Sequence, residues 1–214
     1  MKLEDARDTE RKHFIPVVKR HPAVIVEGHG ARLRDADGRE YLDLMAGWAV
    51  CCLGHSHPEL VRAISEQAGK LMQTTNIFYN LPQLELIERL STLSNGVLPH
   101  SFLVSSGTEA MEGVIKLAHR ATGRSRFVST ENSFHGRSLG ALRLIGTKKH
   151  REPYAALLPE SNVVPFGKSN STPSVIDQPD RSTVAASLLT SSINCRSSGF
   201  SPGGQATAAV SAGW

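Results

Sequence analysis

The chain has 214 residues, of which 40% are hydrophobic, and its formal net charge of +4 corresponds to a pI near 9.1. This length is enough for one or two domains with a real hydrophobic core. Basic residues near the N-terminus alternate with acidic ones, as on a solvated helix face, so a nucleic-acid-binding arm is not predicted. No apolar run approaches a membrane span, and the charged start does not resemble a signal peptide.

The cysteines do not follow the pattern of a disulfide framework. There are three of them, and Cys51 is adjacent to Cys52 while Cys195 stands alone. An odd count with this spacing favours a reduced, cytoplasmic setting.

The first predicted elements are short strands. Residues 23–27 are expected to form one, and residues 31–35 and 40–44 form a hairpin whose turn contains Asp37 and Gly38. The expected anchors of this hairpin are Leu33, Tyr41 and Leu44.

A histidine-containing turn, residues 54–59, precedes the next predicted helix. Ser56 and Glu59 have the spacing of a capping box, and Pro58 suits the first turn. His55 and His57 have no third ligand in view, so a structural role is favoured over a metal site. The apolar face of the helix comprises Val61, Ile64, Ala68 and Leu71. A further helix is predicted after Asn80, with Gln83 three residues later, a leucine stripe at positions 86, 90 and 93, and a stop at Asn95-Gly96.

Residues 102–122 predict a strand, a small-residue turn and a helix. Residues 102–104 are an apolar run typical of a buried parallel strand, and Ser106-Gly107-Thr108 then interrupts the pattern. From Ala110 the period becomes helical, with Glu112 and Lys116 expected to pair on the exposed face and Gly123 to end the helix. The expected buried face comprises Met111, Val114, Ile115 and Ala118.

This strand–turn–helix geometry presents free backbone N–H groups and a positive dipole end to an anion. It is neither a Walker A motif nor a dinucleotide-binding Gly-x-Gly-x-x-Gly. On this segment alone two readings stay open. The turn binds a phosphate, or Gly107 merely allows the chain to turn while Ser106 or Thr108 caps the helix.

Alternating strands and helices continue beyond this helix. Residues 126–130 are a strand candidate, Ser133–Arg137 form a turn, a short helix follows, and residues 163–166 form another strand. Such alternation predicts an α/β fold with a parallel, helix-covered sheet. The short helix is expected to run through Leu139, Leu142 and Ile145.

The composition changes at about Lys168. The last stretch is rich in Ser, Thr, Ala, Gly and Pro, and its only acidic residues are Asp177 and Asp180. Apart from a brief apolar cluster at 184–189, it shows no period of a helix or strand. Residues 168–214 are therefore interpreted as a disordered tail or as frame-shifted sequence, and we favour the second reading.

Taken together, these motifs resemble those of the fold-type I, class III aminotransferases, most closely the acetylornithine/ornithine branch. The resemblance covers about His13 to Gly167. The matching pieces are Gly30-Ala31-x-Leu33-x-Asp35-x-Asp37-Gly38, Tyr41-Leu42-Asp43, Gly54-His55-x-His57-Pro58, Ser106-Gly107-Thr108-Glu109-Ala110-x-Glu112, Lys116-Leu117-Ala118, and Phe134-His135-Gly136-Arg137-x-Leu139-Gly140-Ala141.

The resemblance implies a cofactor, pyridoxal 5′-phosphate, and a role for each matched residue. The backbone N–H groups of Gly107 and Thr108 would bind its phosphate, and Phe134 would stack on its pyridine ring. Arg137 would bind a substrate carboxylate through its guanidinium fork. Trp48 would line the substrate pocket or simply contribute to packing.

The implied reaction is transfer of an amino group from an amino acid such as acetylornithine or ornithine to a 2-oxo acid. The family's Schiff-base lysine has no counterpart here, because Lys116, Lys148 and Lys149 do not match its position and Lys168 begins the altered stretch. We therefore expect a truncated or frame-shifted chain that is not catalytically competent alone. The alternatives are another class III enzyme, such as an aminomutase or a decarboxylase, or a non-catalytic fragment.

The resemblance also implies a domain organisation. Residues 1–75 would be the N-terminal segment of the small domain and residues 76–167 the first part of the cofactor-binding large domain. The incomplete sheet would leave apolar faces exposed, and a homodimer is the inherited expectation.

Overall fold

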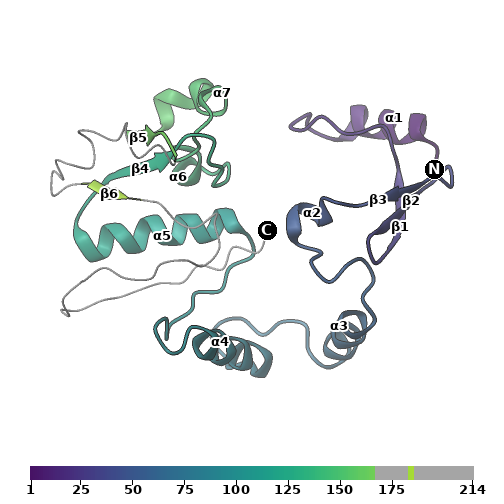
Figure 1. The fold of residues 1–214 in the computed structure, drawn as a ribbon, viewed down its shortest axis with the longest axis horizontal. Coiled ribbons are helices and arrows are strands. Elements are labelled where there is room, and N and C mark those ends of the chain that lie inside the picture. Colours follow the sequence, from purple (N-terminus) through teal and green to yellow (C-terminus); the bar gives the residue numbers. More distant parts are fainter. Residues whose placement is uncertain (167–182, 186–214) are drawn as a thin grey trace. The chain divides into compact units, whose positions relative to one another are not determined.

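The computed structural model describes residues 1–166 and 183–185 and divides into two units, with the boundary between Asn80 and Leu81 (Figure 1). Sequence analysis placed this boundary five residues earlier, between 75 and 76. The assignment of the two segments to the small and large domains of the family stays a prediction. Cys195, Asp177, Asp180 and most of the 168–214 stretch lie outside the described residues. Among the described residues, no helix has the length and apolar character needed to cross a bilayer.

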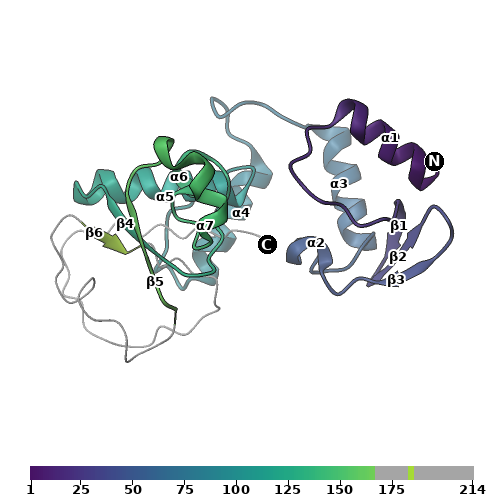
Figure 2. The ribbon, with the colours of Figure 1, turned by 90° about the horizontal axis from the view of Figure 1, so that it is seen from above.

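The first unit contains a three-stranded antiparallel sheet in the order β1-β2-β3 (Figure 2). Leu33 pairs with Tyr41 across the predicted hairpin, which the structure confirms. Leu44 is 87% exposed, so its prediction as an anchor was wrong. The elements of this unit are α1 (Leu3–His13), β1 (Ile25–His29), β2 (Arg32–Asp35), β3 (Glu40–Leu42), α2 (Ala46–Ala49) and α3 (Pro58–Lys70).

The buried carboxylate of Asp35 organises the hairpin turn. Its Oδ1 accepts hydrogen bonds from the backbone N–H groups of Asp37 and Arg39 at 3.0 and 2.9 Å, and the Tyr41 hydroxyl donates to Oδ2 at 2.6 Å. These bonds, led by that from Tyr41, lower the pKa of Asp35 below its ordinary value. Asp35 of the hairpin motif therefore stabilises the turn by accepting hydrogen bonds from its backbone N–H groups.

The histidine-containing turn is a second structural connection within this unit. His55 pairs with Gly30 in an antiparallel bridge, and its Nε2 lies 2.7 Å from Oδ2 of Asp43. Gly54, at φ +82°, lies so close to Gly30 that a Cβ on it would approach the Gly30 Cα to 2.9 Å. These contacts assign His55 a role in joining the turn to the sheet.

The predicted capping box at Ser56 was wrong. α3 begins after His57 with no side-chain cap, and the Ser56 hydroxyl donates to the carbonyl of Gly28 at 2.9 Å. Ser56 has a φ of 54°, and this left-handed conformation belongs to the turn that joins the helix to β1. A tertiary contact thus replaces the expected local one.

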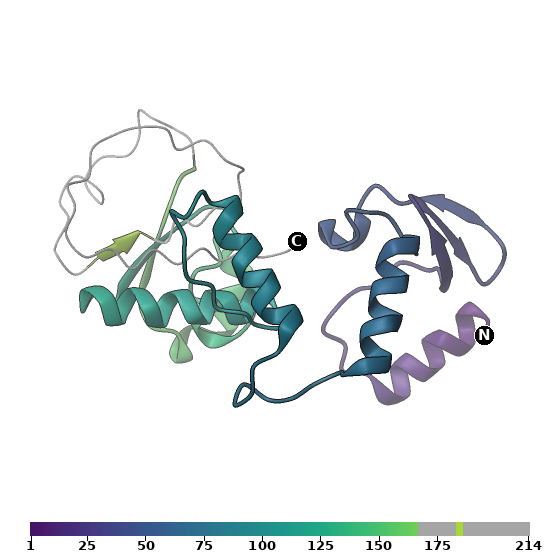
Figure 3. The same cartoon turned by 90° about the horizontal axis from the view of Figure 1, so that it is seen from below.

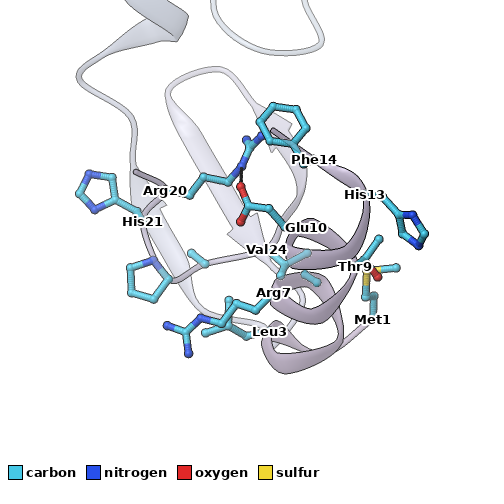
Figure 4. Close-up of a pocket in the computed structure, with 13 residues that line it drawn as sticks. Met1, Leu3, Arg7, Thr9, Glu10, His13, Phe14, Arg20, His21 and Val24 are labelled. Atoms are coloured by element: carbon cyan, nitrogen blue, oxygen red, sulfur yellow. Dashed lines mark hydrogen bonds and ion pairs between the residues drawn. The ribbon is translucent and has the colours of Figure 1, made fainter. Parts of the chain in front are cut away.

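A hollow of about 450 Å³ lies between α1 and the segment that leads into β1 (Figure 4). Arg20 reaches across it, with Nε 2.6 Å from Oε1 of Glu10 and its guanidinium carbon 4.8 Å from the centroid of the Phe14 ring. One ion pair and one cation–π contact therefore connect α1 to the chain that follows it.

The second unit is built on a parallel sheet in the order β5-β4-β6, as the alternation of elements predicted. β6 lies inside the stretch that sequence analysis interpreted as a tail, and its pairing supplies hydrogen-bond partners along the second edge of β4. The elements are α4 (Leu81–Leu93), α5 (Gly107–Thr122), β4 (Arg126–Thr130), α6 (Leu139–Leu142), α7 (Lys148–Arg151), the 3₁₀ helix η1 (Glu152–Leu157), β5 (Ser161–Val164) and β6 (Thr183–Ala185).

α5 packs on β4 through the face that its period predicted (Figure 3). Met111 and Phe127 form the buried cluster with Ala141 and Leu144, and Ile115 and Ala118 pack against it. Gly123 ends α5 in the left-handed conformation, with φ 71°, as predicted. Helix period and stop signal therefore placed this element correctly.

Residues 102–104 do not form the predicted strand. They have no ladder partner among the described residues, and Phe102 is 70% exposed. The backbone groups of an isolated extended segment bond to water, so the segment is no more stable than irregular chain. A strand is stable only as a member of a sheet.

The Phe127 ring should contribute a large share of the stability of the second unit. It is 1% exposed, and replacing it with alanine removes a buried ring and leaves a cavity. We expect Phe127→Ala to lower the free energy of unfolding of this unit by about 3–5 kcal/mol, measured by amide exchange in β4 under increasing denaturant. Phe102→Ala is the control, because that ring is 70% exposed, and equal losses in the two variants would contradict the packing described here.

Candidate functional site

The N-terminus of α5 presents free backbone donors. Ser106 caps the helix, since its Oγ accepts a hydrogen bond from the Glu109 N–H at 3.2 Å. The carboxylate of Glu109 folds back to accept from the N–H of Ser105 at 2.7 Å. No hydrogen bond within the described part of the chain uses the N–H groups of Gly107 or Thr108. These two donors, at the positive end of a 16-residue helix, can bind an anion.

The Ser133–Arg137 turn lies directly against this helix end. Gly136, at φ +123°, is so close to Thr108 that a Cβ on it would lie 2.8 Å from the Thr108 Cβ. A side chain at this position is excluded both by that contact and by the left-handed backbone. Glycine at position 136 therefore allows the turn to approach the two free N–H groups.

Glu112 fastens the segment after the turn to α5. Its Oε1 accepts hydrogen bonds from the Ser138 hydroxyl at 2.5 Å and from the Ala141 N–H at 3.1 Å. A Cβ on Gly140 would lie 2.8 Å from the Glu112 Cδ, so a side chain at this position would displace the carboxylate. The predicted pair between Glu112 and Lys116 was wrong, because the carboxylate instead accepts hydrogen bonds from Ser138 and Ala141.

Phe134 and Arg137 lie side by side on the turn. The guanidinium carbon of Arg137 is 5.9 Å from the centroid of the Phe134 ring, and both side chains are exposed, Phe134 by 41%. A half-exposed aromatic face next to a free guanidinium suits a ligand that combines a flat ring with a carboxylate. The turn thus brings both groups to the unit that carries Gly107 and Thr108.

His135 lies between these residues in the sequence and is buried, with 8% of its surface exposed. Burial lowers the pKa of His135 below its ordinary value, so the imidazole is neutral at neutral pH. Sequence analysis gave this residue no role. Within the turn His135 and Gly136 are buried, while Phe134 and Arg137 on either side of them are exposed.

Trp48 belongs to the first unit. It lies in α2, where residues 46–49 all have positive φ, and its side chain is 73% exposed. Left-handed backbone at a bulky residue costs roughly 1–2 kcal/mol, so surrounding structure must hold it. The proposed role of Trp48 in substrate binding stays a prediction.

The described residues contain no group of three or more His, Cys, Asp or Glu side chains arranged to hold a metal ion. The chemical groups of the candidate site are instead two backbone N–H groups, one aromatic face and one guanidinium. Such a set suits an organic ligand that carries a phosphate and a flat ring and that lies next to a carboxylate group.

A sequence model of the family described as "Aminotransferase class-III" matches residues 15–191. The matched range extends past Gly167, where the sequence motifs end. Two curated relatives are an acetylornithine aminotransferase from Methanopyrus kandleri, 42% identical over 173 residues, and a [LysW]-aminoadipate semialdehyde transaminase from Deinococcus radiodurans, 45% identical over 158 residues. The first match covers 81% of this chain and 44% of the relative, and the second covers 72% and 36%. The chain therefore spans less than half the length of these relatives.

A solved structure shares the fold. The adenosylmethionine-8-amino-7-oxononanoate aminotransferase from Methanocaldococcus jannaschii superposes with a TM-score of 0.69 at 25% sequence identity. The superposition covers 76% of this chain and 40% of that protein. The α/β architecture predicted from the sequence, part of a fold-type I enzyme, is confirmed.

Glu112 should determine how firmly residues 138–141 are held on α5. We expect Glu112→Ala to speed amide exchange at Ala141 by about 10-fold or more, because losing the acceptor of a buried N–H costs about 1–3 kcal/mol. Glu112→Gln keeps an oxygen acceptor and should change exchange much less. Lys116→Ala, an exposed change on the same helix, is the control, and equal acceleration in that variant would contradict this role.

Proposed function

This chain belongs to the class III aminotransferases, and we propose that it supplies the phosphate-, ring- and carboxylate-binding groups of an enzyme that transfers an amino group from an amino acid to a 2-oxo acid. Enzymes of this family depend on pyridoxal 5′-phosphate. The observation that carries the proposal is the contact between Gly136 and Thr108, which joins the aromatic turn to the free N–H groups of α5.

The residues present fit this cofactor. The N–H groups of Gly107 and Thr108 would bind the phosphate, since both are free and lie at a helix N-terminus. The exposed face of Phe134 would stack on the pyridine ring. The absence of a side chain at Gly136 lets the turn that carries Phe134 lie against Thr108.

Arg137 would hold the substrate. Its guanidinium carbon lies 5.9 Å from the centroid of the Phe134 ring, and the group can bind a carboxylate with two parallel hydrogen bonds. Lysine could not reproduce this fork, so Arg137 would select amino acids and 2-oxo acids over simple amines and aldehydes. Trp48 is proposed as a further contact to the substrate.

When bound, the cofactor supplies an electron sink that allows a proton to leave the substrate carbon. The protein groups in this chain orient both partners around that carbon. Burial lowers the pKa of His135, so Arg137 is the cation that the turn would offer to a substrate carboxylate. The prediction that this chain lacks the Schiff-base lysine and is incompetent alone remains to be tested.

The proposed amino donor is acetylornithine or a similar amino acid with an amino group at the end of its side chain. The proposal rests on the relatives named acetylornithine aminotransferase and [LysW]-aminoadipate semialdehyde transaminase. The first name gives an amino-acid derivative and the second a semialdehyde as a participant in amino-group transfer. Recognition of the distant carboxylate by Arg137 would then set which end of the substrate meets the cofactor.

We also propose that the functional protein is a homodimer in the cytoplasm. Apolar side chains on α3 and the segment after it are exposed, as an unpartnered interface would be. Ile64 is 60% exposed and Phe78 is 67% exposed. Association with a second copy would bury these side chains.

The cofactor-binding proposal predicts that the phosphate group contributes most of the affinity. The chain should bind pyridoxal 5′-phosphate at least 10-fold more tightly than pyridoxal, as measured by equilibrium titration of ligand absorbance. Gly107→Pro removes one N–H donor at the first helical position, where proline is tolerated. It should weaken binding of the phosphorylated ligand about 10- to 100-fold, because a hydrogen bond to a charged group contributes about 1.5–3 kcal/mol.

Gly107→Ala is the matched control, since it adds a side chain but keeps the N–H, and Phe134→Ala should weaken both ligands about equally. Equal affinity of the wild-type chain for pyridoxal and its phosphate would refute the proposed phosphate site and favour a non-catalytic fragment. Borohydride treatment followed by mass spectrometry tests the prediction about the lysine, because covalently retained cofactor would contradict it.

A further inference from the structure

A second group of cations surrounds a hollow of about 380 Å³ in the second unit. It lies between the end of α6, α7, the 3₁₀ helix and the start of β5. None of its lining residues belongs to the α5 terminus or to the 133–137 turn. The hollow is lined by Arg143, Lys148, Arg151, Glu152, Ala155, Leu158, Pro159, Glu160 and Ser161.

Arg143 is the most constrained of these residues. Only 7% of it is exposed, and its guanidinium carbon lies 4.4 Å from the centroid of the buried Phe127 ring. Its Nε is buried without a hydrogen-bond partner, and none of its other side-chain nitrogens forms a hydrogen bond or ion pair with a described residue. The Phe127 ring stabilises the positive charge of Arg143 from one face, but it provides no hydrogen-bond acceptor for the five guanidinium N–H groups.

Arg151, which also lines the hollow, repeats this feature. Its Nε is also buried and has no hydrogen-bond partner, although the residue as a whole is only half-buried. Lys148, one turn earlier on α7, adds a third positive charge. Glu152 and Glu160 line the same hollow, yet neither forms an ion pair with these three cations within the described ranges 1–166 and 183–185.

Buried guanidinium N–H groups almost always have acceptors, because leaving them without any costs the full desolvation of the charge. Three cations and two carboxylates leave one net positive charge around the hollow. Its volume is that of a small-molecule site and not of a macromolecular groove. A compact group with several acceptor oxygens would pair with these donors.

We propose that this pocket binds a small-molecule oxyanion, a phosphate or carboxylate group, held by Arg143 and Arg151 with Lys148 at its side. The planar forks of the two arginines suit the parallel oxygens of such a group. Two cations on α7 and one after α6 would then be joined through the ligand, which would order α7 on the sheet. This site does not depend on the proposed aminotransferase activity.

The test is titration of the complete chain with inorganic phosphate, and separately with succinate as the carboxylate probe, by calorimetry and by amide exchange in residues 143–151. The chain should bind at least one of the two probes and slow exchange in α7. Arg143→Met keeps the apolar stem on Phe127 but removes the donors, and it should weaken binding about 10-fold or more. Arg151→Met, at a less buried position, should do the same if Arg143→Met fails to fold.

Lys116→Met, an exposed charge change on α5, and Gly107→Pro, at the proposed cofactor site, should both leave the probe-induced slowing of exchange in α7 unchanged. Binding that Gly107→Pro abolishes and the arginine variants leave intact would overturn the proposal, because the probe would then occupy only the α5 terminus. Absence of binding by both probes, with wild-type exchange in α7, would overturn it as well. Preference between phosphate and succinate identifies the type of oxyanion.

Discussion

The second unit depends on the contact between α5 and the residues that follow β4. At one end Thr108 occupies the space that a side chain at Gly136 would need, and one turn further along Glu112 accepts hydrogen bonds from Ser138 and Ala141. Two glycines and one carboxylate thus fix a loop on a helix. The loop carries an aromatic face and a guanidinium, and the helix offers the anion-binding N–H groups, so the geometry of the candidate site follows from this contact.

Phe127 connects the two regions of interest in this unit. One side of its ring is part of the buried cluster that holds α5 on β4, and the guanidinium of Arg143 lies 4.4 Å from its centroid. The same strand therefore supports the α5 site and the basic hollow through one side chain. Burial lowers the pKa of Arg143, and the carboxylate of Glu112 partly opposes this effect, so the charges of the two regions are also coupled.

The family motifs of the first unit serve its architecture. Asp35 binds the backbone of the hairpin turn, and Asp43 accepts from the backbone of Met45 and Ala46 and contacts His55. These hydrogen bonds lower the pKa of both carboxyl groups, so both stay ionised at neutral pH. In the second unit, by contrast, the motif residues include the partly exposed ring of Phe134 and the exposed side chain of Arg137. Motifs of the same family thus hold turns in one unit and present free binding groups in the other.

The sequence by itself determined the elements whose rules act within a few residues. The bounds of β4, the cap and glycine stop of α5 and the Asp-Gly hairpin all follow from neighbours along the chain. Only the tertiary structure decided contacts between distant residues. The Glu112 carboxylate accepts a hydrogen bond from Ser138, 26 positions later, and does not pair with Lys116. The Ser56 hydroxyl donates to the carbonyl of Gly28 and does not cap its own helix. Residues 102–104 are not part of a sheet among the described residues. In the folded chain a donor can bond to any acceptor that folding brings close, whereas a local sequence pattern contains only acceptors that are near in the sequence.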